Sequence, residues 1–238
     1  MFKEILIDSA QKCEFNFNER QLEQFEIFYE MVVEWNEKIN LTAIVDEKDF
    51  VIKHIIDSLM VYDEEKFAGV KNFCDVGTGA GFPAIPLKIF KPELEVTLID
   101  SLAKRVEFLK KVVEELQLDN VVCLHGRAED LGRDKNLRES FDLVTARAVA
   151  RLNILAEYCL PFVKVGGTFA ALKGKIYREE ILESESAIKI LGGGEITFSE
   201  KNLPELNDIR GIIYIYKKFN TPKKFPRKAG TPTKNPLS

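Results

Sequence analysis

The stretch Cys74–Pro83 reads Cys-Asp-Val-Gly-Thr-Gly-Ala-Gly-Phe-Pro, the pattern of a buried strand, a glycine turn and the start of a helix. Its glycines, at 77, 79 and 81, permit positive φ and let the backbone pass close under a ligand. Pro83 suits the first turn of the next helix, whose unpaired N–H groups face the same space. The stretch therefore predicts a site for a nucleotide-like cofactor.

The type of nucleotide follows from the residues around the turn. A dinucleotide fingerprint places a third glycine three residues after the second, where this chain has Phe82, so NAD is disfavoured. The next expected strand, 95–99, ends in Asp100, which lies 23 residues after Gly77. A carboxylate there can accept hydrogen bonds from both hydroxyls of a ribose. The competing interpretation is a structural turn with a helix-capping aspartate, which any doubly wound sheet can contain.

Composition sets broad limits on the fold. A chain of 238 residues can hold one sizeable α/β domain plus a small accessory region. No apolar run is long enough for a membrane span, and no signal peptide is visible, so we expect a cytoplasmic protein without a membrane partner. The cysteines show neither metal-ligand nor redox spacing, so no metal is expected; they are Cys13, Cys74, Cys123 and Cys159.

Charge is distributed unevenly along the chain. Residues 217–238 hold seven bases and no acid, so the remainder, with 27 of the 34 bases and all 38 acids, carries −11. A basic tail on an acidic body suggests an anionic partner that the tail meets first. The alternative is a solvated terminus that only aids solubility.

The order of expected elements predicts the architecture. Residues 1–66 are predicted to be helical, with a capping box at Asn18 and Gln21 and a second helix over 50–61. Strands are expected near 72–76, 95–99, 121–125, 141–146 and 167–172, alternating with helices. Such alternation predicts a Rossmann-like, mostly parallel sheet in a domain spanning 67–219.

The last part of this domain departs from strict alternation. Gly166 and Gly167 are expected to end a helix that begins near Arg151. Two strands, near 195–200 and 210–217, follow without a helix between them and should pair antiparallel. S-adenosylmethionine-dependent methyltransferases finish their sheets in this way. Residues 220–238 contain four prolines and no periodic pattern, and we expect a basic tail that is mobile on its own.

The sequence resembles the glucose-inhibited division protein B (RsmG) family, whose members are guanine-N7 methyltransferases that act on 16S ribosomal RNA. The resemblance runs nearly end to end. The glycine loop alone is common to many methyltransferases, but the set of matching segments is specific. These segments are Trp35–Thr42, Lys53-His54 with Asp57-Ser58, Asp75–Pro83, Asp100-Ser101 with Lys104-Arg105, Arg127–Glu129, Thr145–Ala148 and Thr221–Pro232.

The resemblance implies S-adenosylmethionine as cofactor and assigns site residues. It implies that Gly77 and Phe82 line the cofactor site, that Ala128 and Glu129 meet the adenosine end, and that Arg147 completes the pocket. The turn and spacing arguments add two further cofactor-binding candidates, Gly79 and Asp100. RNA contact is expected from four bases of the tail, and the partner is 16S ribosomal RNA or the small ribosomal subunit, bound by a monomer. The four bases are Lys223, Lys224, Arg227 and Lys228.

Several of these residues also have a structural interpretation. Glu129 could simply open a short helix, where the helix dipole favours an acid. Arg147 could be a surface arginine paired with an acid. His54 and Asp57 are three residues apart on one helix face, and a local hydrogen bond explains them better than a catalytic dyad.

The expected chemistry requires no acid or base. Guanine N7 carries an in-plane lone pair and no proton, so it can attack a sulfonium methyl directly. We therefore assign no catalytic residue and expect catalysis by positioning. Three rival functions remain: a small-molecule methyltransferase, a nicotinamide-dependent oxidoreductase, and a non-enzymatic RNA-binding factor of ribosome assembly.

Overall fold

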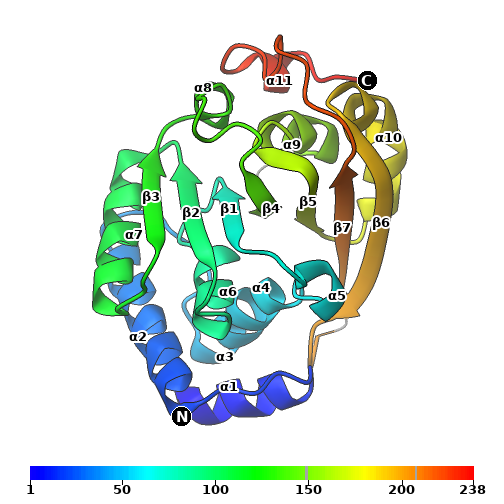
Figure 1. Cartoon of the computed structure of the whole chain (residues 1–238). Coiled ribbons are helices and arrows are strands. Elements are labelled where there is room, and N and C mark those ends of the chain that lie inside the picture. The colour runs from blue at the N-terminus through cyan, green and yellow to red at the C-terminus, as the bar shows by residue number, and fades with distance from the viewer. Residues whose placement is uncertain (148–149, 207) are drawn as a thin grey trace.

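A single sheet lies at the centre of the computed structural model, which describes residues 1–147, 150–206 and 208–238 (Figure 1). Within these residues seven strands follow the order β3-β2-β1-β4-β5-β7-β6. β1 to β5 are parallel, and β7 is antiparallel to both of its neighbours. The predicted mostly parallel sheet with one antiparallel strand is confirmed. The strands are β1 (Asn72–Val76), β2 (Glu95–Asp100), β3 (Val121–His125), β4 (Phe141–Arg147), β5 (Val163–Lys173), β6 (Gly193–Asn202) and β7 (Ile209–Lys217).

Helices cover both faces of this sheet. The N-terminal helices stand at the end of the sheet opposite to α8 and α11 (Figure 1). The helices of the described residues are α1 (Phe2–Gln11), α2 (Glu19–Asn36), α3 (Glu47–Phe50), the π-helical turn η1 (Val51–Ile56), α4 (Asp57–Leu59), α5 (Glu64–Phe67), α6 (Ala84–Phe90), α7 (Ala103–Glu115), α8 (Ala128–Leu131), α9 (Leu152–Cys159), α10 (Tyr177–Ile190) and α11 (Thr231–Lys234).

Alternation along the strands divides the interior into two cores. Phe73 packs in the core that the N-terminal helices share with α6 and α7, whereas Cys74 packs in the core beneath α9 and α10. Successive side chains of a strand point to opposite faces, which explains the division. The N-terminal helices therefore share a core with the sheet rather than forming one of their own.

The N-terminal helices agree well with the sequence pattern. The Asn18 side-chain oxygen accepts a hydrogen bond from the backbone N–H of Gln21 at 3.0 Å, and the Gln21 side-chain oxygen accepts one from the backbone N–H of Asn18 at 3.0 Å. The capping box at the start of α2 is therefore confirmed. The helix expected over 50–61 is found as the run α3, η1 and α4, with a π-helical middle.

The prediction that Gly166 and Gly167 end a helix was wrong. α9 ends at Cys159, and both glycines lie inside β5. Gly166 has φ of +91°, and a Cβ on Gly167 would lie 2.6 Å from the carbonyl oxygen of Asp142. The pairing of β5 with β4 shifts register at this point, so the two glycines form a bulge against β4.

The prediction of a mobile C-terminal tail was also wrong. Residues 221–238, here called the strap, lie across the end of the molecule that contains α8 and α9 and include the short helix α11 (Figure 1). Phe225 is only 4% exposed and belongs to the core beneath α9. Arg138 donates to the carbonyl oxygens of Thr221 and Phe225, at 2.6 and 2.9 Å. A buried ring and these backbone bonds supply the order that the absence of periodicity did not suggest.

Candidate cofactor site

A pocket of about 250 Å³ opens at the carboxyl ends of β1, β2 and β3. It is here that a parallel sheet of this type binds its ligands. Its wall comes from the ends of these three strands, from α9 and from the strap. The lining residues are Val76, Gly77, Ile99, Asp100, Ser101, Gly126, Arg127, Ala128, Glu129, Ala150, Tyr158 and Thr233.

The glycine loop between β1 and α6 forms the floor of this site. Gly77, Gly79 and Gly81 have φ of +73°, +61° and +100°, a region that side chains with a Cβ rarely occupy. The N–H groups of Gly77 and Thr78 donate to the carbonyl oxygen of Ile99, at 2.8 and 3.1 Å, and fix the loop to β2. A Cβ on Gly79 would meet open space, so the backbone there leaves room for a ligand.

Asp100 closes the adjoining corner, at the end of β2. Its side chain is 3% exposed; Oδ2 accepts the N–H of Gly79 at 3.0 Å and Oδ1 accepts the N–H of Leu102 at 2.8 Å. Arg105 lies 3.6 Å from Oδ2. A carboxylate has about four acceptor sites. Asp100 therefore organises the glycine loop and retains acceptor capacity for a ligand in the pocket.

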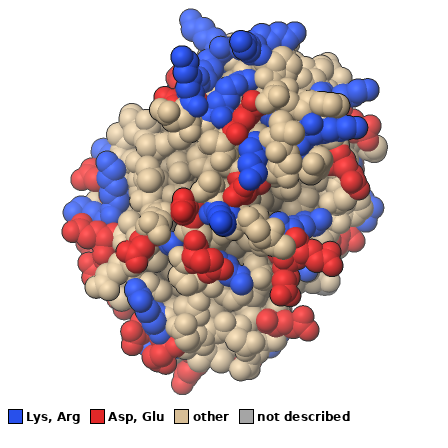
Figure 2. Space-filling view, in the orientation of Figure 1, with Lys and Arg blue, Asp and Glu red and all other residues tan. Residues whose placement is uncertain are grey.

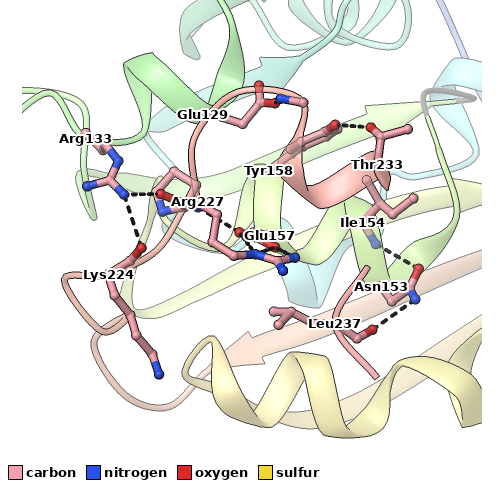
Figure 3. Close-up of polar contacts among 12 residues, drawn as sticks. Glu129, Arg133, Asn153, Ile154, Glu157, Tyr158, Lys224, Arg227, Thr233 and Leu237 are labelled. Carbon is pink, nitrogen blue, oxygen red and sulfur yellow. Dashed lines mark hydrogen bonds and ion pairs between the residues drawn. The ribbon is translucent and has the colours of Figure 1, made fainter. Parts of the chain in front are cut away.

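Ala128 and Glu129 start α8, with two residues between it and the end of β3, and also line the pocket. Glu129 is 4% exposed, and its Oε1 accepts the N–H of Gly230, in the strap, at 2.8 Å (Figure 3). The carboxylate thus does more than favour the start of a helix, because a distant segment of chain fixes its orientation.

Three of the expected cofactor residues, Gly79, Phe82 and Arg147, are not among the residues that line this pocket, and Gly79 adjoins it only through its hydrogen bond to Asp100. Phe82 is 5% exposed and stacks on His54 with ring centroids 4.4 Å apart. The Arg147 guanidinium carbon lies 4.8 Å from the centre of the Phe82 ring. Arg147 is the last residue of β4. Ala148 and Val149 follow it and lie outside the described residues, and Ala148 is the last residue of the family-matching segment Thr145–Ala148.

Arg147 instead joins a polar cluster with the N-terminal helices. It donates to Asp57 Oδ2 at 3.0 Å and lies 3.2 Å from His54 Nδ1, while Arg210 donates to Asp57 Oδ1 at 2.7 Å. Thr42 Oγ1 lies 2.7 Å from His54 Nε2. His54 and Asp57 thus both contact Arg147. This shared partner takes the place of the local hydrogen bond that was expected between the two side chains.

Burial shifts the pKa values of two groups near the glycine loop. Burial and the charge of Arg147 lower the pKa of His54 to about 3, so its ring is neutral at pH 7. Burial raises the pKa of Asp75, at the end of β1, to about 7. Asp75 Oδ2 and Thr78 Oγ1 are buried without a hydrogen-bond partner among the described residues. Neither residue lines the pocket, so the carboxylates that can accept hydrogen bonds from a ligand there are those of Asp100 and Glu129.

The basic residues expected to bind RNA divide into two groups. Lys223, Lys224 and Lys228 are exposed on the strap, and Figure 2 shows basic side chains gathered at that end of the molecule. Arg227 instead donates hydrogen bonds from Nε and Nη2 to the carboxylate of Glu157, at 2.9 and 2.6 Å, and Glu157 is fully buried (Figure 3). Arg227 therefore anchors the strap.

Lys217 is one of the seven bases of residues 217–238, but its side chain is fully buried at the end of β7. Its Nζ lies 3.6 Å from Glu139 Oε1 and donates to the carbonyl oxygen of Leu160 at 2.5 Å. Burial lowers the pKa of Lys217 to about 8. The charge available to a partner is thus smaller than the sequence count suggests.

The sequence interpretation missed the contribution of the strap and α9 to the pocket. Thr233 and Tyr158 both line it, and their hydroxyl oxygens lie 2.9 Å apart. One signal was available: Glu157 stands within the otherwise apolar run 154–160 and, as a buried acid, requires a cationic partner. That partner is Arg227 in the strap.

The fold is similar to that of solved methyltransferase structures. A putative caffeoyl-CoA O-methyltransferase from Staphylococcus aureus matches with a TM-score of 0.52 and 18% identity, over 90% of this chain and 98% of that one. A precorrin-6y C5,15-methyltransferase from Geobacter metallireducens matches with a TM-score of 0.51 and 13% identity, over 68% and 88%. At these identities the likeness concerns the fold alone.

Sequence comparison shows the family as well as the fold. The profile of the family described as "GidB: rRNA small subunit methyltransferase G" matches residues 21–207. Proteins named "Ribosomal RNA small subunit methyltransferase G" match at 48% identity in Lactobacillus johnsonii, over 100% of both chains, and at 51% in Exiguobacterium sibiricum, over 92% of each. Among the described residues no helix is long and apolar enough to cross a membrane. The chain belongs to the rRNA small subunit methyltransferase G family.

Proposed function

We propose that this protein transfers the methyl group of S-adenosylmethionine to N7 of guanine 527 in 16S ribosomal RNA. The observation that carries the proposal is a pocket of about 250 Å³ beside the glycine loop, in a chain whose relatives are named "Ribosomal RNA small subunit methyltransferase G". The small ribosomal subunit in the cytoplasm, or its RNA, is then the partner, bound by a monomer.

The pocket residues suit the nucleoside part of the cofactor. Gly77 brings the backbone close to it, Gly79 holds the Asp100 carboxylate through its N–H, and Asp100 offers its remaining acceptor sites to ribose hydroxyls. Ala128 and Glu129 flank the place of the adenine ring. Arg147 and Phe82 lie outside this pocket, in contact with each other and with His54, so their assignment to the cofactor stays a proposal that rests on the family resemblance.

The state of the titratable groups agrees with attack by a proton-free nitrogen. The cofactor supplies an electrophilic sulfonium methyl, and guanine N7 supplies the lone pair, so no residue needs to remove a proton. Burial raises the pKa values of all four cysteines, that of Cys123 to about 11, which leaves no thiolate for carbon methylation at pH 7. The chain contributes positioning, worth up to about 7–11 kcal/mol in favourable systems.

Methyl transfer from tritiated S-adenosylmethionine tests this function. Naked 16S RNA, assembly intermediates and finished small subunits are purified from cells that lack the enzyme, and each is offered to the protein. Label in at least one of them, and none with Gly77→Val, is the expected result. Transfer to none of the three would contradict the proposal and favour a small-molecule methyltransferase or a non-enzymatic assembly factor. Titration with NADH alongside S-adenosylmethionine excludes or supports an oxidoreductase.

A further inference from the structure

The segment 228–236 of the strap is a bridge with both ends fixed on α9. Upstream, Arg227 holds Glu157 through its backbone N–H at 2.7 Å as well as through its guanidinium. Downstream, Asn153 Nδ2 donates to the carbonyl oxygen of Leu237 at 3.1 Å (Figure 3). The two anchors lie one helical turn apart on α9, so residues 228–236 between them form an arch that lies beside this helix.

The arch passes over the pocket and touches it at two points. Gly230 donates its N–H to Glu129 Oε1 at 2.8 Å, with φ of +80° at the turn. Three residues later, Thr233 Oγ1 lies 2.9 Å from the hydroxyl of Tyr158 (Figure 3). Glu129, Tyr158 and Thr233 all line the pocket, so each contact joins the strap to a pocket-lining side chain.

Each contact restrains a side chain that lines the pocket. Glu129 has a long flexible side chain and starts a four-residue helix, and the Gly230 N–H is the hydrogen-bond donor that fixes its carboxylate. The Tyr158 ring lies partly exposed on α9, and Thr233 holds its hydroxyl end. Residues that contact a ligand bind it tightly when their geometry is fixed in advance.

We propose that the strap is a working part of the cofactor site, in which Gly230 and Thr233 are positioning residues for Glu129 and Tyr158. This rests on the proposed function, because it takes S-adenosylmethionine as the ligand of the pocket. The strap then has two separable roles: an outward role, in which its exposed lysines meet RNA, and an inward role, in which its backbone turn and Thr233 contact side chains that line the cofactor pocket.

Calorimetric titration with S-adenosylmethionine tests the inward role. Thr233→Val keeps the size of the side chain and removes the hydroxyl, and we expect binding to weaken about two- to tenfold, the range for one neutral hydrogen bond. Thr233→Ser keeps the hydroxyl and should restore the affinity. Thr231→Val is the matched control on the same turn of α11, and its affinity should stay within about twofold of wild type.

A truncation that removes residues 229–238 keeps the Arg227 anchor and deletes both contacts. We expect it to bind S-adenosylmethionine at least about tenfold more weakly while circular dichroism shows a folded protein. In steady-state methyl transfer, Thr233→Val should raise KM for the cofactor and leave kcat and KM for RNA unchanged, a split that general destabilisation would not produce.

Two results would overturn the inference. One is wild-type affinity in the folded truncated protein, and the other is equal affinity in Thr233→Val, Thr233→Ser and Thr231→Val. Failure of the proposed function looks different, because the wild-type protein itself would then fail to bind S-adenosylmethionine or to methylate RNA.

Discussion

Gly77 is the residue on which the cofactor site depends most directly. Its φ of +73° disfavours any β-branched side chain, and the residue lines the pocket that the cofactor would occupy. We expect Gly77→Val to abolish S-adenosylmethionine binding in calorimetry while the protein stays folded. Near-normal affinity in a folded Gly77→Val protein would remove the glycine loop from the site.

Asp100 combines a ligand role with a structural one. Asp100→Ala should weaken S-adenosylmethionine binding by about 1.5–3 kcal/mol, as expected for lost hydrogen bonds to a charged group. It should also lower Tm, because the N–H groups of Gly79 and Leu102 lose their acceptor. Methyl transfer at saturating cofactor should survive. Turnover that collapsed while affinity held would show that Asp100 acts on the reaction rather than on the ribose.

The sequence predicted individual site residues unevenly. Gly77 and Asp100 follow from local rules, since a glycine turn and the end of the next strand meet at one edge of a parallel sheet. The surroundings of Phe82 and Arg147 do not follow, because the stack with His54 and the ion pair with Asp57 join segments that are far apart in the chain. Contacts of this kind depend on tertiary packing, which no local pattern encodes.

At the scale of elements, the π-helical turn η1 carries the buried His54 to the end of β4. The folded-state pKa of about 3 lies below the ordinary value of 6.5, so between these pH values the unfolded chain binds a proton that the folded chain does not. This group therefore contributes stability that is fully present above pH 6.5 and is lost as the pH falls toward 3. Urea unfolding between pH 4 and 6 gives the free energy of unfolding at each pH, and its slope against pH measures the protons taken up on unfolding. In His54→Gln this uptake should be smaller by up to about one proton. An unchanged slope would contradict the buried neutral imidazole.

The elements themselves were predictable where pattern and packing agree. β1 to β4 alternate with helices and carry apolar runs, so their positions followed from the sequence. The start of β5 did not, because Gly166 and Gly167 have the signature of a helix end and only the approach of the Asp142 carbonyl shows why they form a bulge. Glycine pairs mark a special backbone without saying which one.

At the scale of the whole molecule, the exposed lysines of the strap should govern RNA affinity. Replacing Lys223, Lys224 and Lys228 by Gln should flatten the slope of log affinity against log salt by up to about 0.7 per lost contact, the value for single strands. Binding of 16S RNA is measured at several salt concentrations. Arg227 stays intact in this variant, because its partner is Glu157 and its loss would release the strap. The same slope in variant and wild type would leave these lysines with a solubilising role only.

The strap also shows what composition could not reveal about the whole molecule. Proline content and the lack of periodicity predicted mobility, yet Phe225 packs in a core and the half-buried Arg227 pairs with the buried Glu157. Removal of residues after Asn220 should therefore impair cofactor binding together with RNA binding, because the strap also contacts the pocket-lining side chains of Glu129 and Tyr158. An isolated segment can lack a core of its own and still be ordered by the surface that it covers.

Mapping the methyl group in the RNA tests the central claim most directly. Small subunits or 16S RNA from cells that lack the enzyme are methylated with the purified protein and then treated with borohydride and aniline, which cleave the chain at N7-methylguanosine. The account predicts cleavage at guanine 527 with the wild-type protein and none there with Gly77→Val. Cleavage at another guanine, or methyl incorporation without cleavage, would contradict it.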